Sequence, residues 1–274
     1  MDALRPYLAA FSARFSLTLQ YRAAAIAGFA TQCWWGVMKI MVYAAFFAGA
    51  AGPPPLSLAH TVTYTWLGQA FLVLQPWNAD PDVNTMVRTG AVAYERLRPV
   101  DTWAWWYARA MAWSVARVIP RAALMFALAM VILPLVGLGQ WSLRPPASLE
   151  AGLLFVLSLI GTVLLSASMT VLLNVVVTAT MTDRGANALA SPLVIVLSGS
   201  IAPLAFFPDW MRPFLRAQPF AGLVDTPFRV WFGDLTGADA LAGIALQLFW
   251  TVVLALIGRA WLGAAMRRLQ VQGG

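Results

Sequence analysis

The sequence contains few charged residues. Only 11% of its 274 residues are charged and 61% are hydrophobic, whereas soluble domains contain about 25% charged residues. The mean hydropathy is correspondingly high, at +0.73. This composition lies far outside the range of soluble globular domains and indicates an integral membrane protein.

Residues that bind metals or carry out catalysis are also scarce. The sequence has one histidine, His60, and one cysteine, Cys33, which excludes two-histidine zinc sites, cysteine clusters and an intrachain disulfide. The only glutamates, Glu95 and Glu150, are expected on opposite sides of the membrane. We therefore predict no metal site, and a membrane-embedded enzyme is disfavoured.

Lysine is almost absent. The only lysine, Lys39, lies between Met38 and Ile40 in an apolar stretch. A Walker A loop needs a lysine next to serine or threonine to hold the phosphates of ATP. The chain is therefore expected to bind no cofactor, and any ATP and Mg²⁺ would be held by a separate subunit.

Six apolar stretches are long enough to cross a bilayer as helices, which requires about 20 residues. They are residues 23–47, 58–77, 117–138, 149–180, 187–207 and 240–262. The 13 tryptophans and 15 phenylalanines suit the aromatic belts at two lipid–water boundaries. We predict an all-α integral membrane protein with six transmembrane helices in a single domain, 1–274.

The arginines indicate the orientation of these helices. With both termini in the cytoplasm, the outer loops contain only Arg144, Arg212, Arg216 and Arg229, and the other arginines lie inside or near the inner boundary. This is the bias that the positive-inside rule describes. The net charge of +7 is spread between the apolar stretches, so it does not indicate nucleic-acid binding.

A proline-rich segment, residues 208–233, separates the last two apolar stretches. Pro213, Pro219 and Pro227 interrupt it, and proline cannot continue a helix. Irregular backbone beside a bilayer is tolerated only where protein or water surrounds it. We predict a re-entrant or interfacial element on the outer face. The residues expected to act as an outer gate are Phe207, Pro208, Trp210, Pro219 and Phe220.

Two further segments are expected on the cytoplasmic side. In residues 1–22, apolar side chains recur at steps of three and four, namely Leu4, Tyr7, Leu8, Phe11, Phe15 and Leu19. This period predicts an amphipathic interfacial helix, and the segment could equally be a positively charged flank of the first span. In the loop 78–109, Asp82 is expected to cap one short helix and Asp101 a second, whose tryptophans would lie at the membrane interface.

The proline-rich segment and the cytoplasmic loop both resemble those of ABC-2 type permeases, the membrane subunits of bacterial ATP-driven exporters. The residues that carry the resemblance are Gly199, Pro203, Phe206, Phe207, Pro208, Trp210, Gln218 to Gly222, Pro227 and Gly233, together with Arg88-Thr89-Gly90 and Leu97-Arg98-Pro99-Val100. The expected six spans with both ends inside also match this family, so the resemblance extends over nearly the whole chain.

The resemblance implies a function and partners. It implies export of a hydrophobic or amphipathic cargo through a bacterial inner membrane, with ATPase subunits beneath and a second permease, identical or paralogous, beside the chain. A short coupling helix in the cytoplasmic loop would dock on the ATPase. The residues assigned to this coupling are Arg88, Glu95, Arg96, Arg98 and Pro99. The alternative is a membrane scaffold or assembly protein that transports nothing.

Three polar side chains within the apolar stretches are candidates for the transport path: Lys39, Gln69 and Asn174. A lysine at the centre of a spanning helix costs roughly 2.5–3.5 kcal/mol on insertion scales, so such groups face a cavity or another helix. Two interpretations stay open for each residue, because amides and amines also form hydrogen bonds that hold helices together.

Overall fold

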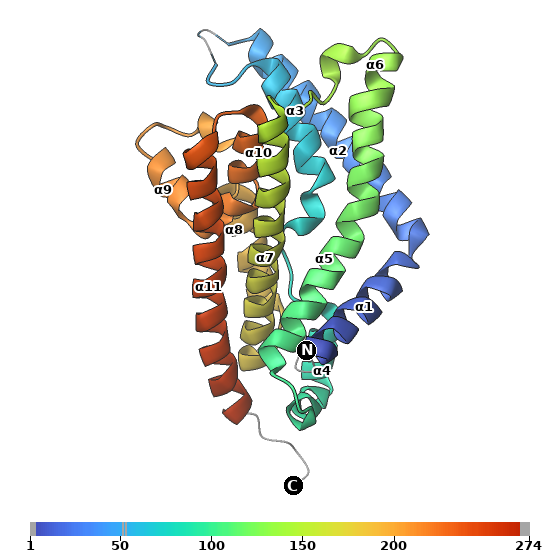
Figure 1. The fold of residues 1–274 in the computed structure, drawn as a ribbon, viewed down its shortest axis with the longest axis vertical. Coiled ribbons are helices and arrows are strands. Elements are labelled where there is room, and N and C mark those ends of the chain that lie inside the picture. The colour runs from blue at the N-terminus through green and yellow to red at the C-terminus, as the bar shows by residue number, and fades with distance from the viewer. Residues whose placement is uncertain (1–3, 51, 53, 269–274) are drawn as a thin grey trace.

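The protein is a helical bundle. The structure, a computed structural model, describes residues 4–50, 52 and 54–268, and this part of the chain forms helices and no strands. The α-helices are α1 (Arg5–Leu19), α2 (Arg22–Ala48), α3 (Leu58–Ala70), α4 (Pro81–Arg88), α5 (Thr102–Phe126), α6 (Leu133–Leu135), α7 (Leu149–Thr180), α8 (Arg184–Leu197), α9 (Arg212–Ala217), α10 (Asp225–Phe232) and α11 (Gly237–Arg268). Figure 1 shows α2, α5, α7 and α11 running along the long axis.

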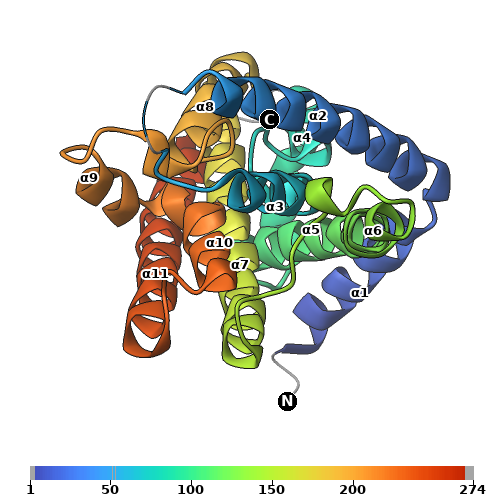
Figure 2. The same ribbon diagram turned by 90° about the horizontal axis from the view of Figure 1, so that it is seen from above.

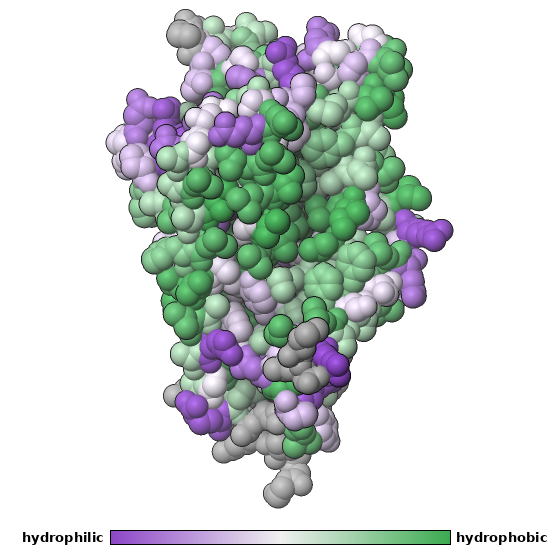
Figure 3. All heavy atoms as spheres, in the orientation of Figure 1, coloured by the Kyte–Doolittle hydropathy of each residue, from purple (hydrophilic) through white to green (hydrophobic). Residues whose placement is uncertain are grey.

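Among the described residues, three helical segments are both long and apolar enough to cross a membrane: Thr102–Leu135, Leu149–Thr180 and Gly237–Arg267. The first is continuous because a π-helical turn, Ala127–Ile132, joins α5 to α6. Helix α2 has 27 residues and is therefore about 40 Å long at 1.5 Å per residue. Lys39 lowers the mean hydropathy of this helix. On the face seen in Figure 3, hydrophobic residues form a band across the middle and hydrophilic residues gather at both ends.

Two of the expected spans are not continuous helices. In the stretch 58–77, α3 ends at Ala70, a short 3-10 turn follows, and Pro76 prevents the helix from continuing. In the stretch 187–207, α8 ends at Leu197 and Gly199 takes a φ of +88°. A Cβ on Gly199 would lie 2.6 Å from the Tyr64 hydroxyl oxygen. The helix therefore ends well before Pro208, the position at which the sequence predicted the end.

The third expected span was also placed too late in the chain. The second helix of the cytoplasmic loop and the stretch 117–138 are one helix, which starts at Thr102 and passes through Pro120 without ending. Asp101 caps it as expected, since its Oδ1 accepts a hydrogen bond from the amide of Ala104 at 2.7 Å. Trp103 and Trp106 are buried inside the protein and do not lie at the membrane interface.

The N-terminal segment forms α1, which lies beside α5 and meets α2 at a sharp corner (Figures 1 and 2). Its buried or half-buried residues are Pro6, Tyr7, Ala10, Phe11, Arg14, Phe15 and Thr18. Of the expected apolar face, Tyr7, Phe11 and Phe15 lie on this side, whereas Leu4, Leu8 and Leu19 are exposed. The buried side of this helix therefore includes about half of the face that the apolar period predicted.

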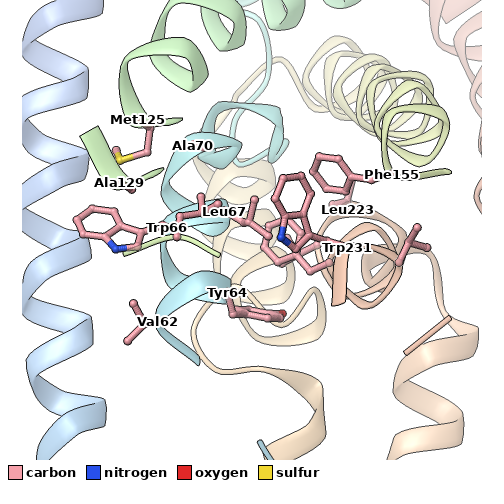
Figure 4. Packing of buried hydrophobic residues seen from close by; sticks show 14 of the residues in the cluster. Val62, Tyr64, Trp66, Leu67, Ala70, Met125, Ala129, Phe155, Leu223 and Trp231 are labelled. Atoms are coloured by element: carbon pink, nitrogen blue, oxygen red, sulfur yellow. The ribbon is translucent and has the colours of Figure 1, made fainter. Parts of the chain in front are cut away.

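The main hydrophobic core surrounds α3. Figure 4 shows Trp66 and Leu67 of α3 between Met125 of α5 and the ring pair Phe155–Trp231. The two rings of that pair lie 4.7 Å apart, edge to face, which adds to the stabilisation from their burial. The short helices α3 and α10 therefore occupy the centre of the bundle, and the longer helices enclose them.

The proline-rich segment dips into the bundle between α7 and α11. Its lowest part is the 3-10 turn Pro219–Leu223, in which a Cβ on Gly222 would lie 2.9 Å from Leu165. Leu165 is near the midpoint of α7. From this turn α10 returns and stops at Gly233, which takes a φ of +78°. The segment therefore enters the bundle and turns back, and we call it the re-entrant segment for this shape.

A buried glutamine holds the re-entrant turn in place. Gln247 of α11 donates to the carbonyl of Gly222 at 2.7 Å and to the Thr162 hydroxyl at 3.2 Å. Its side-chain oxygen accepts a hydrogen bond from Ser158 at 3.1 Å. Gln247 is not among the path residues predicted from the sequence. Its position in an apolar stretch could have identified it, because an amide inside a membrane needs hydrogen-bond partners.

We expect Gln247→Leu to destabilise the protein by about 1–3 kcal/mol, because it removes several intramembrane hydrogen bonds worth about 0.6 kcal/mol each and leaves the buried Ser158 hydroxyl without its acceptor. Thermal unfolding in detergent measures this change. Gln140→Leu is the matched control, because Gln140 is exposed. An equal unfolding midpoint for the two variants would contradict the anchoring role.

Candidate functional site

A cavity of about 750 Å³ lies where two helices are broken. Its walls come from α2, from the C-terminal end of α3 and from the segment that follows α8. Its polar lining residues include Gln32, Lys39, Tyr43, Gln69 and Ser200, and tryptophan and aliphatic side chains form the rest. Lys39 and Gln69, two of the three path residues predicted from sequence, therefore face the same space.

Side chains from α2 and α3 bind the exposed backbone after α8. Lys39 donates to the carbonyl of Ser200 at 2.6 Å, Tyr43 to that of Ile201 at 3.0 Å, and Tyr64 to that of Gly199 at 3.0 Å. Backbone carbonyls at membrane depth cannot be satisfied by lipid. The positive charge of Lys39 also lies near the C-terminal end of α8, where it is electrostatically favoured. These three donors therefore stabilise the break.

Two amide side chains on the cavity wall have acceptor atoms without a partner. The Oε1 atoms of Gln32 and Gln69 are buried and form no hydrogen bond with any residue that the structure describes. A buried polar atom left unpaired costs about 1–3 kcal/mol. Because both oxygens are buried, a molecule that enters the cavity can bind them only if the two side chains turn towards it.

Asn174, the third predicted path residue, lies elsewhere. It is buried near the C-terminal end of α7, and its Oδ1 accepts a hydrogen bond from the amide of Asp80 at 2.8 Å. Asn187 of α8 similarly accepts from the amide of Ala79 at 3.1 Å. Together the two asparagines fix the backbone from which α4 starts.

The predicted gate residues do not form one cluster. Phe207 packs against the small core of Leu204, Leu215 and Ala221, whereas Phe220 packs against the main core. Pro208 and Trp210 are exposed, and Pro219 begins the re-entrant turn. The aromatic contact with α2 is made by a residue that the prediction omitted, Phe206, whose ring lies 6.0 Å from that of Tyr43 and 6.3 Å from that of Phe46.

Acidic residues at the start of α4 connect the cytoplasmic loop to two other helices. Asp80, and not Asp82 as predicted, caps α4 by accepting from the amide of Asp82 at 2.9 Å. Asp82 instead forms ion pairs with Arg14 of α1 and, at 2.9 Å, with Arg109 of α5. The loop is therefore joined electrostatically to α1 and α5.

Glu95, one of the predicted coupling residues, is internal. It is 4% exposed and accepts a hydrogen bond from the Trp106 indole at 3.3 Å, while Arg98 pairs with it at 3.3 Å. Glu95 can thus act on a partner protein only by positioning its neighbours. The exposed surface beside it includes Tyr94 and Leu97, at 70% and 77% exposure.

The remaining predicted coupling residues divide into two groups. Arg88 and Pro99 are exposed on the same loop, whereas the Arg96 side chain lies outside the part of the chain that the structure describes. We define the coupling surface as Arg88, Tyr94, Leu97, Arg98 and Pro99. Exposed apolar side chains next to arginines are typical of a protein-binding surface.

The loop is also tied to the C-terminal helix. Asp101 pairs with Arg259 of α11 at 3.0 Å, and the Asp101 amide donates to the Tyr7 hydroxyl of α1 at 3.1 Å. The region from α4 to the start of α5 therefore contacts α1, α7, α8 and α11 through specific polar bonds. Within residues 4–50, 52 and 54–268, no group of His, Cys, Asp and Glu side chains could hold a metal ion.

Long apolar helices are those of a membrane protein that crosses the bilayer more than once. Comparison with known families agrees, since residues 61–273 match the family described as ABC-2 family transporter protein. The match covers well over half of the chain, so the chain belongs to the ABC-2 family and is an ABC transporter permease. Among curated proteins, none matches this chain.

We expect Lys39→Met to loosen the break after α8. The change removes the charged donor to Ser200, and such a bond contributes about 1.5–3 kcal/mol, so amide hydrogen exchange of Ser198–Ala202 should rise at least about tenfold. Exchange in lipid nanodiscs measures the effect. Lys39→Arg keeps a charged donor and should retain most of the protection. Unchanged exchange in Lys39→Met would exclude the stabilising role.

Asp82→Asn should release α1 from the cytoplasmic loop. Because Asp82 is half exposed, its ion pairs contribute about 0.4–1 kcal/mol, and hydrogen exchange over α1 should rise about two- to fivefold. Asp209→Asn is the control, because Asp209 pairs only locally, with Arg212 on the same segment. If both variants exchange like the unmodified protein, the ion pairs do not hold α1.

Proposed function

We propose that this chain is the transmembrane permease subunit of an ATP-driven ABC-2 exporter in a bacterial inner membrane, with both termini in the cytoplasm. The observation that carries the proposal is the family match over residues 61–273. The cavity beside Lys39 supports a passage role, since it combines apolar walls with a few polar groups, as sites for small amphipathic molecules do.

ATP hydrolysis belongs to separate subunits in this proposal. The sequence lacks a Walker A lysine, so the chain supplies the path and not the energy. Two ATPase subunits would bind at the coupling surface, and ATP and Mg²⁺ would be held there and not by this chain. A second permease, identical or paralogous, would complete the path beside it.

The polar bonds of the cytoplasmic loop suggest how movement is transmitted. An ATPase that pushes on the coupling surface displaces α4, which Asn174 and Asn187 connect to α7 and α8. The end of α8 forms one wall of the cavity and is held by Lys39. A shift of α8 therefore changes the size of the cavity and the donors that face it. The six-span arrangement and the outer gate at Phe207, Pro208, Trp210, Pro219 and Phe220 remain part of this proposal.

Cargo in this mechanism is hydrophobic or amphipathic. It enters the cavity from the cytoplasmic half, binds against Gln32, Lys39 and Gln69, and leaves past the re-entrant segment. The experiment that tests the function is coexpression with the ATPase subunits encoded beside it, followed by ATPase measurements in nanodiscs. A stable complex whose hydrolysis rises with a hydrophobic compound supports the exporter, and failure of any ATPase to copurify favours a scaffold.

We expect Leu97→Glu to reduce ATPase copurification at least about tenfold, because a charge at an exposed apolar anchor disrupts a docking contact worth about 2 kcal/mol. Met181→Glu is the matched control. Met181 is also exposed, at 51%, and lies in the turn between α7 and α8. Equal copurification of both variants would remove the coupling surface from the mechanism.

A further inference from the structure

Two arginines one turn apart on α5 have no acidic partner. Arg117 and Arg121 lie within the spanning segment Thr102–Leu135. In the described residues no carboxylate forms an ion pair with either of them. Like charges at positions i and i+4 of a helix repel each other, and charged groups within spanning segments are costly unless they are paired or hydrated. The pair therefore requires an anion or water beside it.

Both guanidinium groups face cavities. A cavity of about 770 Å³ lies between α1, α2 and α5, and a second of about 290 Å³ lies behind it, towards α7. Arg117 and Arg121 line both of them. The one carboxylate on the wall of the larger cavity is that of Asp82, and it is already paired with Arg14 and Arg109.

The positions of the two guanidinium groups are fixed. That of Arg117 lies over the Trp113 ring, 4.1 Å from its centroid, a contact that arginine makes through its flat face. Arg121 donates to the carbonyl of Ala24 at 3.3 Å, and its buried Nε has no hydrogen-bond partner among the described residues. A Cβ on Gly28 would lie 2.6 Å from Arg121 Cζ, so this glycine provides the space that the guanidinium occupies.

Besides the polar side chains of Arg14, Thr18, Tyr21 and Arg22, the wall of the larger cavity has an apolar part. Leu17 of α1, Ile26 of α2, and Pro120 and Leu124 of α5 line it, and Leu17, Ile26 and Leu124 are exposed at the surface of the bundle. A ligand that fits this lining has an anionic headgroup for the arginines and an apolar chain for the aliphatic side chains. Basic pockets between spanning helices bind phospholipid headgroups by the same chemistry.

We propose that Arg117 and Arg121 bind the anionic headgroup of an amphiphile, of the phosphate or carboxylate type, whose chain leaves the cavity between α1 and α5 towards the cytoplasmic leaflet. Guanidinium groups bind such oxyanions through paired, charge-assisted hydrogen bonds. Both arginines line the two cavities, so a headgroup in either cavity lies beside the guanidinium groups.

This site also bears on the cargo, in a step that rests on the proposed function. The smaller cavity shares Thr31, Gln32, Leu72 and Trp77 with the cavity that contains Lys39. Arg117 and Arg121 of α5 and Lys39 of α2 thus line two adjoining cavities, and among the residues that the structure describes no acidic side chain lines either of them. An exported amphiphile with an anionic headgroup would use both the arginine site and Lys39. A resident anionic phospholipid would use only the site at Arg117 and Arg121.

Native mass spectrometry of the purified chain tests the binding site, with phosphatidylglycerol and phosphatidylcholine as probes. The unmodified protein should retain phosphatidylglycerol in preference to phosphatidylcholine. The double variant R117Q/R121Q should retain at least about tenfold less, since charge-assisted hydrogen bonds are lost. R117K/R121K keeps both charges and should retain an intermediate amount, which separates binding from misfolding.

The matched control is R184Q/R267Q, which removes two exposed arginines that line neither cavity. It should retain phosphatidylglycerol like the unmodified protein. Equal retention by R117Q/R121Q and the unmodified protein would overturn the site. Equal loss in R184Q/R267Q would overturn it too, because net charge alone would then account for binding.

A second measurement distinguishes the two sources of the amphiphile. In nanodiscs that contain the ATPase complex, ATP-dependent movement of headgroup-labelled phosphatidylglycerol to the outer leaflet, lost in R117Q/R121Q, identifies it as cargo. Stimulated hydrolysis without movement identifies a resident lipid. The binding measurement needs no ATPase, so failure of the complex to form would contradict the exporter and leave the result at Arg117 and Arg121 intact.

Discussion

The structure depends on satisfying backbone carbonyls where α8 ends inside the bundle. Lys39, Tyr43 and Tyr64 donate to three consecutive carbonyls of the segment after α8, and Gln75 donates to the Ser200 hydroxyl at 3.0 Å. Without these donors the broken backbone would face lipid with unpaired groups, which the bilayer does not tolerate. The same donors line the principal cavity, so the feature that stabilises the break also gives the cavity its polar wall.

A second polar cluster solves the same problem for the re-entrant segment. Gln247 and Thr162 bind the carbonyl of Gly222 in the middle of the bundle, and the aromatic core of α3, α7 and α10 packs above it. Aromatic packing and buried hydrogen bonds therefore surround α3 and α10. The cavity lies beside this part, against α2 and the end of α8.

The cytoplasmic half has a different character, because ion pairs and amide bonds replace aromatic packing. Asp82, Asp101 and Asn174 each join the loop to a separate helix. Half-exposed ion pairs are individually weak, and a set of weak bonds can be rearranged without unfolding the helices. This combination suits a loop that receives movement from a partner and passes it to several helices.

Much of this organisation followed from the sequence alone. Composition indicated a membrane protein, Leu149–Thr180 was expected with the bounds that α7 has, and Asp101 was correctly assigned as a helix cap. These features depend on local hydropathy and local hydrogen bonding, which can be read along the chain. The resemblance to ABC-2 permeases was confirmed by the match over residues 61–273.

Only the tertiary structure decided which residues meet. The ends of α3 at Ala70 and α8 at Leu197 depend on donors that lie far away in the sequence, so hydropathy predicted two longer helices. Lys39 and Gln69 face one cavity while Asn174 holds the start of α4, although all three looked equivalent as polar residues in apolar stretches. Likewise, Glu95 is buried and accepts a hydrogen bond from the Trp106 indole, a contact that packing decides. The sequence by itself determined that long apolar segments are present, among them Leu149–Thr180 with its bounds, because hydropathy is a property of each segment. Their breaks, their partners and the roles of their polar side chains were decided by packing, because a polar group in an apolar surrounding takes its role from the partner it finds.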